Sequence, residues 1–114
     1  MVKSFVSTFR PRTDYVGNSP EVQQAWQAYL EGLGSKLIDA GNPVFVRQQV
    51  GQCGADTVLG GYSIVNAEDL SAAVAMASGC PVLSAGGGVE VGELTRLNQE
   101  QVQTTVADHR RATA

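Results

Sequence analysis

Arg47 and Glu90 are the two side chains in this sequence whose chemistry best suits work on a small organic molecule. A guanidinium can bind a carboxylate or an enolate-like oxygen. A partly buried carboxyl group can acquire a raised pKa, and it can then orient that oxygen or move a proton. The two side chains could also form an ion pair that fixes the register of a dimer, because buried charges are normally paired. We favour the ion pair, and we name Arg47 and Glu90 as the catalytic candidates if the protein is an enzyme.

Other side chains could hold a ligand. Trp26, Tyr29 and Tyr62 could line an apolar pocket between a sheet and a helix, although aromatic residues at helical spacing more often belong to the core. Polar groups expected near Arg47 add to this set. The candidate ligand-binding residues are Ser7, Gln49, Tyr62, Ser63 and Trp26.

Two further features have a structural interpretation that we prefer. Cys53 and Cys80 lack CxxC spacing and have no histidine nearby in sequence, so they predict ordinary free thiols rather than a metal site. The glycine run 86–88 leads into a strand, whereas phosphate-binding glycine loops lead into a helix. It therefore predicts a bulge or a flexible approach to the strand. We expect neither a metal nor a cofactor.

The segments that must position these residues begin with a strand over residues 3–10, which Pro11 ends because proline cannot donate to a ladder. Ser19 and Pro20 then start a helix, as a cap and a first helical residue. Apolar residues at helical spacing extend this helix to 41–43, where glycine and proline stop it.

The rest of the chain alternates in the same way. The sequence predicts strands over 44–50 and 58–65, a helix that begins at Asn66 and ends at 79–81, and a strand centred on 89–91. The order β-α-β-β-α-β is typical of an α+β, ferredoxin-like domain with a four-stranded antiparallel sheet and both helices on one face. We assign residues 1–97 to this domain and 98–114 to a tail with a short helix, which contains His109.

Strand alternation divides the side chains between two sheet faces. The set assigned to the helix side is Val6, Val44, Val46, Tyr62, Ile64, Val89 and Val91. The other set is Phe5, Ser7, Phe9, Phe45, Arg47, Gln49, Gly61, Ser63, Val65, Glu90 and Leu94. Because phenylalanines that face water would form an exposed apolar patch, we predict that a second copy covers this face. The resulting barrel would enclose Arg47, Gln49, Ser63 and Glu90.

Composition excludes several classes of function. The chain has 114 residues and a net charge of −3, with Arg110-Arg111 as its only adjacent basic pair, so a nucleic-acid partner is not expected. No apolar run approaches the roughly 20 residues of a membrane span, and the N-terminus lacks the apolar stretch of a signal peptide. We expect a cytoplasmic protein with no membrane partner.

Two stretches of the sequence resemble a known family. Leu59-Gly60-Gly61-Tyr62-Ser63-Ile64-Val65, with Ala67-Glu68-Asp69-Leu70 after it, and Gly87-Gly88-Val89-Glu90-Val91, with Cys80-Pro81 before it, look like the YCII-related (DGPF-domain) family. That resemblance implies a dimeric α+β barrel with ferredoxin-like subunits. The Asp-Gly-Pro-Phe motif itself is absent, and the histidine of the family's His–Asp pair has no counterpart in the matching region. No catalytic residue is carried over.

We therefore expect a small homodimeric α+β barrel that binds a small organic molecule or catalyses cofactor-independent acid–base chemistry of the lyase or isomerase kind. A non-catalytic dimerisation or accessory module is the alternative, and a cofactor-free monooxygenase with an aromatic substrate beside Trp26 or Tyr62 is a further one. An open cavity of roughly 300 Å³ or more, lined by Arg47 or Glu90, would favour binding or catalysis over the module.

Overall fold

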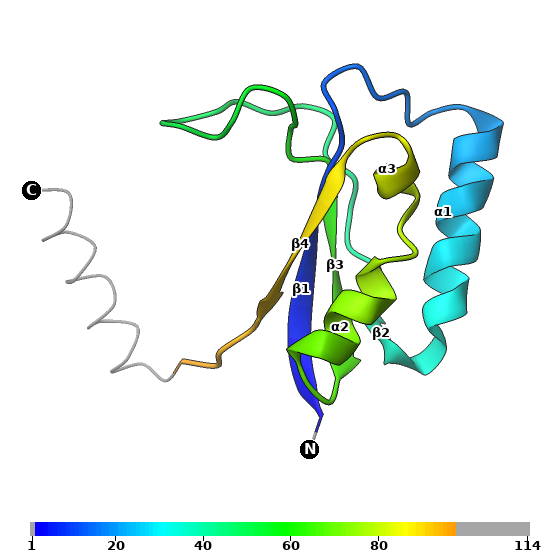
Figure 1. The fold of residues 1–114 in the computed structure, drawn as a ribbon, viewed down its shortest axis with the longest axis vertical. Helices are drawn as coiled ribbons and strands as arrows, with labels where there is room; N and C mark the ends of the chain where they lie inside the picture. The colour runs from blue at the N-terminus through cyan, green and yellow to red at the C-terminus, as the bar shows by residue number, and fades with distance from the viewer. Residues whose placement is uncertain (1, 98–114) are drawn as a thin grey trace, which may run out of the picture.

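The computed structural model describes residues 2–97, which form one antiparallel sheet with helices on one side (Figure 1). The elements in chain order are β1 (Lys3–Arg10), α1 (Pro20–Leu33), the 3-10 turn η1 (Gly34–Lys36), β2 (Leu37–Asp39), β3 (Gly61–Ala67), α2 (Leu70–Ala77), α3 (Pro81–Ser84) and β4 (Gly88–Glu93). The strand order is β2-β3-β1-β4. This is the ferredoxin-like arrangement, so the predicted fold class is confirmed.

Local signals explain where the helices begin. The Ser19 hydroxyl accepts a hydrogen bond from the Val22 amide at 3.3 Å, and Pro20 is the first residue of α1, as predicted. In α2 the cap is Asp69, whose carboxylate accepts from the Ala72 amide at 2.8 Å. The predicted start at Asn66 is wrong, because Asn66 belongs to β3 and pairs with Ser4 of β1.

The second strand lies earlier in the chain than predicted. Helix α1 ends at Leu33 because Gly34 adopts a φ of 58°, a left-handed conformation that glycine tolerates. After η1, β2 pairs with β3 through Leu37 and Asp39. The predicted strand over 44–50 is wrong: residues 44–58 form an irregular arm that extends away from the sheet on the side opposite α1 (Figure 1).

The helices cover the phenylalanine-bearing face of the sheet. Phe5 is 0% exposed and packs with Val65 and Ala73 of α2, whereas Phe9 is 6% exposed and packs with Val82 of α3. The prediction that a second copy covers this face is wrong. Alternation grouped the side chains of β1 and β3 correctly, but it cannot tell which of two faces receives the helices.

The last strand has the predicted orientation, with Val89 and Val91 on the helix side and Glu90 on the other side, but its valines share their face with the phenylalanines of β1 and not with Val6. Val89 is opposite Phe9 in the register and Val91 is opposite Ser7, so both valines lie on the helix side. Glu90 is opposite Thr8 and is exposed on the other face. That other face, called here the open face, consists of Ser4, Val6, Thr8, Arg10, Tyr62, Ile64, Asn66 and Glu90.

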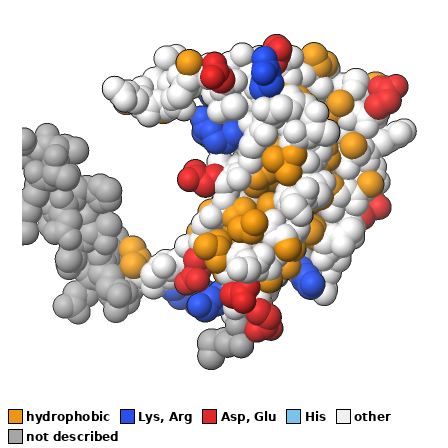
Figure 2. Space-filling model, viewed as in Figure 1, with side chains coloured by type: hydrophobic (Ala, Val, Ile, Leu, Met, Phe, Trp, Pro, Cys, Tyr) orange, Lys and Arg blue, Asp and Glu red, His pale blue; other side chains and the backbone are white. Residues whose placement is uncertain are grey.

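In the described part of the chain no helix packs on the open face, and charged side chains border the hollow between it and the arm (Figure 2). Within residues 2–97 no helix is long and apolar enough to cross a lipid bilayer. The predicted tail helix over 98–114, with His109 and Arg110-Arg111, lies outside the described residues.

The assignment of the sheet faces can be tested by replacing one phenylalanine that the helices cover and one that lies on the exposed arm. Phe5→Ala is expected to lower the free energy of unfolding by about 3–5 kcal/mol, because it leaves a cavity in the core. Phe45 is 75% exposed on the arm, so Phe45→Ala is expected to cost less than about 1 kcal/mol. Urea denaturation measures both, and Phe5→Leu supplies a milder variant if Phe5→Ala does not fold. Equal costs for the two alanine variants would contradict the assignment.

Candidate functional site

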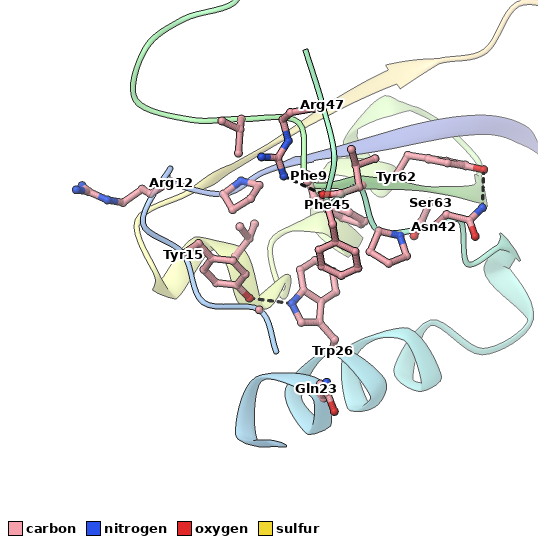
Figure 3. Close-up of a pocket in the computed structure, with 18 of the residues that line it drawn as sticks. Phe9, Arg12, Tyr15, Gln23, Trp26, Asn42, Phe45, Arg47, Tyr62 and Ser63 are labelled. Atoms are coloured by element: carbon pink, nitrogen blue, oxygen red, sulfur yellow. Dashed lines mark hydrogen bonds between the residues drawn. The ribbon is translucent and has the colours of Figure 1, made fainter. Parts of the chain in front are cut away.

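A cavity of about 440 Å³ opens between α1, the adjoining ends of β1 and β3, and the start of the arm. Its lining is rich in aromatic side chains: Phe9, Tyr15, Trp26 and Phe45 lie near one another in Figure 3, whereas Tyr62 projects from the other face of β3 and borders the cavity at its edge, beside Asn42. Ligand sites in proteins typically measure about 300–1,000 Å³ and are mostly apolar, with a few polar groups. The cavity is therefore of a size and character suited to a small organic molecule.

Trp26 is held in one orientation by its neighbours. Its ring meets that of Phe9 edge to face, with centroids 4.8 Å apart and planes at 71°. Its Nε1 donates a hydrogen bond to the Tyr15 hydroxyl at 2.9 Å. This bond uses a lone pair of the phenol oxygen, so the O–H of Tyr15 remains available to donate to a molecule in the cavity.

Arg47 reaches the cavity from the arm (Figure 3). Its Nε donates to the Leu59 carbonyl at 2.9 Å, and its Nη2 donates to the Val44 carbonyl at 2.8 Å. The predicted ion pair with Glu90 does not form within the chain, because Glu90 projects from the open face of the sheet and does not line the cavity. Arg47 instead joins the two ends of the arm.

The cavity brings together four of the residues predicted from the sequence. Arg47, Tyr62, Ser63 and Trp26 all line it, and the buried Ser63 hydroxyl donates to the Ala40 carbonyl at 2.7 Å. The other three are elsewhere: Ser7, Gln49 and Glu90 do not line it. Ser7 is buried beneath the helices, and Gln49 is exposed on the arm, because the strand on which its position was predicted does not form.

The sequence analysis missed several lining residues. Tyr15 and Arg12 lie in the polar stretch after β1, and Asn42 follows β2; each lines the cavity. The Asn42 side-chain amide also donates to the Tyr62 hydroxyl at 3.3 Å. Tyr15 could have been found from the sequence, because it is an aromatic residue in a mostly polar loop, and such residues often contact a ligand or an interface. The contacts of Arg12 and Asn42 had no such signal.

Two adjacent glycines let the chain pass closely around the cavity. A Cβ on Gly60 would lie 2.5 Å from Cδ of Pro11, so no larger residue fits without a shift. Gly61 has a φ of 151° and approaches the backbone of Asn42 and Pro43. The Gly60-Gly61 pair noted in the sequence is therefore required by the close contact of three segments around this wall.

The cysteine beneath the cavity is not poised for chemistry. Burial raises the pKa of the Cys80 thiol to about 11. Burial, and secondarily the charge of Cys80, raises the pKa of Tyr29 to about 12. Both groups are therefore neutral at physiological pH, and a neutral thiol is a poor nucleophile. Both cysteines are free thiols, as predicted, with Cys53 exposed and Cys80 buried.

Comparison with known proteins gives one informative match. No family model matches the chain, and no curated protein matches it significantly. A solved structure does match: 5-chloro-2-hydroxyhydroquinone dehydrochlorinase (TftG) from Burkholderia phenoliruptrix AC1100, in complex with 2,5-dihydroxybenzoquinone. The TM-score is 0.59 at 22% identity, over 82% of this chain and 95% of the other. This likeness shows that the chain shares the overall fold of that protein, in agreement with the ferredoxin-like arrangement described above.

The buried thiol generates a prediction about alkaline stability. The unfolded Cys80 thiol ionises near its usual pKa of 9.0, whereas the folded thiol keeps its proton to about 11. Between these values the folded state binds more protons, so the free energy of unfolding falls as pH rises, by up to about 1.4 kcal/mol per pH unit. Cys80→Ala should make this slope shallower in urea titrations at pH 8 to 10.5.

The matched control for that experiment is Cys53→Ala, which removes a thiol that is exposed in the folded chain. We expect its slope to equal that of the unsubstituted protein. The same change of slope in both variants would contradict the argument. Above pH 10 the slope also includes a contribution from Tyr29, whose pKa is raised from 10.0 in the folded protein. The slope between pH 8 and 10 is therefore the one that tests the role of Cys80.

Proposed function

We propose that this protein binds a small organic molecule with a flat ring in the cavity beside Trp26. The observation that carries this proposal is the enclosure of about 440 Å³ by aromatic side chains and by Arg47. A flat ring suits these walls, because aromatic faces and edges pack favourably against one another. The dehydrochlorinase of the same fold, whose structure holds a dihydroxybenzoquinone, supports this choice of ligand class.

The groups around the cavity favour one kind of chemistry over others. Among the described lining residues there is no Asp, Glu or His, so no conventional general base faces a ligand. Tyr15 and Arg47 are hydrogen-bond donors, and donors stabilise negative charge that develops on oxygen. We therefore propose that any lyase or isomerase activity acts on a molecule that forms an enolate or phenolate, with Tyr15 and Arg47 as the residues that hold the oxygen.

We propose further that two copies associate through the open face. Val6 is opposite Ile64 in the register, and Thr8 is opposite Tyr62, so apolar groups are adjacent at the centre of that face. The arm projects past the same side and carries Val46, which is 94% exposed. Both features suit a partner surface, and the fold is one that forms dimers. This proposal places the second copy on the open face, and not on the phenylalanine-bearing face where the sequence analysis predicted it.

A non-catalytic dimerisation module is the second candidate function. The open face favours it, since that surface would serve association whether or not the cavity is occupied. We also propose that the chain is a divergent relative of the YCII-related family. The glycine pair that carries part of that resemblance, Gly60-Gly61, has a defined role in the cavity wall.

Filling the cavity tests whether it binds ligands. Val44 lines the cavity, whereas its near neighbour Val46 does not. We expect Val44→Trp to weaken binding of benzamide and of 2,5-dihydroxybenzoquinone at least about tenfold, because the indole occupies ligand volume. Val46→Trp, the control, should bind as the unsubstituted protein does. Ligand-observed NMR measures both affinities. Absence of binding to the unsubstituted protein across a panel of ring compounds would remove the proposal.

A charge on the open face tests the dimer. Ile64→Glu is expected to shift the protein towards a single subunit, because it buries carboxylates in the interface. The control is Val74→Glu on α2, an exposed position on the helix side of the sheet. Analytical ultracentrifugation at micromolar concentration measures the state of each. A single subunit for the unsubstituted protein, or equal dissociation of both variants, would contradict association through this face.

A further inference from the structure

The described residues that line the cavity carry charge of one sign. Arg12 and Arg47 are its charged residues, and none of the lining residues is acidic. The chain as a whole has a net charge of −3, so the cavity is positive within a protein that is negative. A cationic rim around an apolar interior attracts a molecule that has an anionic group on a ring.

The two arginines are not equivalent. Arg12 donates from Nε to the Asp14 carboxylate at 3.2 Å, and both side chains are more than half exposed. Its charge is therefore partly offset by a neighbour. Within residues 2–97 the partners of Arg47 are carbonyl oxygens, which are neutral and do not compensate its positive charge. Arg47 is the cation that a ligand would meet.

The hydrogen bonds of Arg47 use one edge of the guanidinium. Nε and Nη2 form that edge, and they donate to the carbonyls of Leu59 and Val44. A guanidinium has five N–H bonds, so two on Nη1 and one on Nη2 remain. One from each of these nitrogens point side by side from the end of the group. Two parallel N–H bonds match the two oxygens of a carboxylate.

The anchoring also keeps this edge in place. Val44 is itself held next to β3, because its amide donates to the carbonyl of Gly60, the residue before that strand, at 3.1 Å. The carbonyls that hold Arg47 therefore come from the two chain segments that meet at the cavity wall. An arginine fixed in this way loses less side-chain freedom when it takes up a ligand than a solvated one would.

We propose that the cavity selects a small aromatic carboxylate, with the anion on the end edge of the Arg47 guanidinium and the ring among Trp26, Phe45 and Phe9. Tyr15 donates its O–H to a second oxygen where the ring carries one. This assignment rests on the proposed binding function. It adds that the ligand is an anion and that Arg47 is the residue that binds the anionic group.

Two probes of the same shape separate charge from fit. Benzoate and benzamide have the same ring and nearly the same outline, but only benzoate is ionised at pH 7. We expect the protein to bind benzoate about fivefold or more tightly than benzamide in low salt, and the ratio to fall as salt rises, since Arg47 is exposed at the rim. Ligand-observed NMR titrations measure both dissociation constants.

Arg47→Gln is expected to bring the ratio of the two affinities close to one while benzamide still binds. Arg96→Gln is the matched control: it removes the same charge from an exposed position that does not line the cavity, and it should keep the preference. Preference kept in Arg47→Gln, or lost equally in Arg96→Gln, would contradict the assignment to Arg47.

The unsubstituted protein separates this inference from the proposed function. Binding of both probes with equal affinity, or a preference for benzamide, would overturn the choice of an anion while the binding function stands. Binding of neither probe would count against the proposed function itself. If Arg47→Gln loses both probes because the arm is no longer held, the ratio in the unsubstituted protein and its salt dependence decide the question alone.

Discussion

The packing of one face of β1 against the helices is the interaction on which the rest of this structure depends. β1 is central in the sheet and pairs with both β3 and β4, so its two faces set the faces of the whole sheet. Phe5 and Phe9 project from the same side and are covered by α2 and α3 respectively. Because Phe9 also meets the ring of Trp26, the same packing positions α1 and forms the floor of the cavity.

A second constraint follows from the short β2. Residues 44–58 form no strand of the sheet, and besides backbone hydrogen bonds at the two ends of the arm, such as that from the Val58 amide to the Pro11 carbonyl at 2.9 Å, two arginines donate to it or to the residue that follows it. Arg47 bonds to the carbonyls of Val44 and Leu59, and Arg10 bonds to the Cys53 carbonyl at 2.9 Å and to the Thr57 hydroxyl at 3.2 Å. The charge at the cavity rim is thus also what holds the wall of the cavity in place.

The sheet separates two kinds of surface. The helix side contains the core and, at one end, the cavity; the open face contains Val6 and Ile64 at its centre and Glu90 on the neighbouring strand. A ligand and a second subunit would therefore occupy opposite sides of a layer one strand thick. Glu90, which the sequence linked with Arg47, belongs to the open face and does not line the cavity.

Much of this protein follows from local signals that the sequence carries by itself. The order of strands and helices, the start of α1 at Ser19-Pro20 and the shared face of Phe5 and Phe9 each depend on neighbouring residues, because caps and alternation act over a few positions. The place of β2, the face that the helices cover and the lining of the cavity depend on contacts between distant segments. The sequence predicted a helix that continues to 41–43, whereas Gly34 and the pairing of Leu37 with Val65 end it earlier. Because side chains alternate along a strand, the sequence divides them into two sets, one for each face of the sheet. It does not show which of the two sets the helices cover.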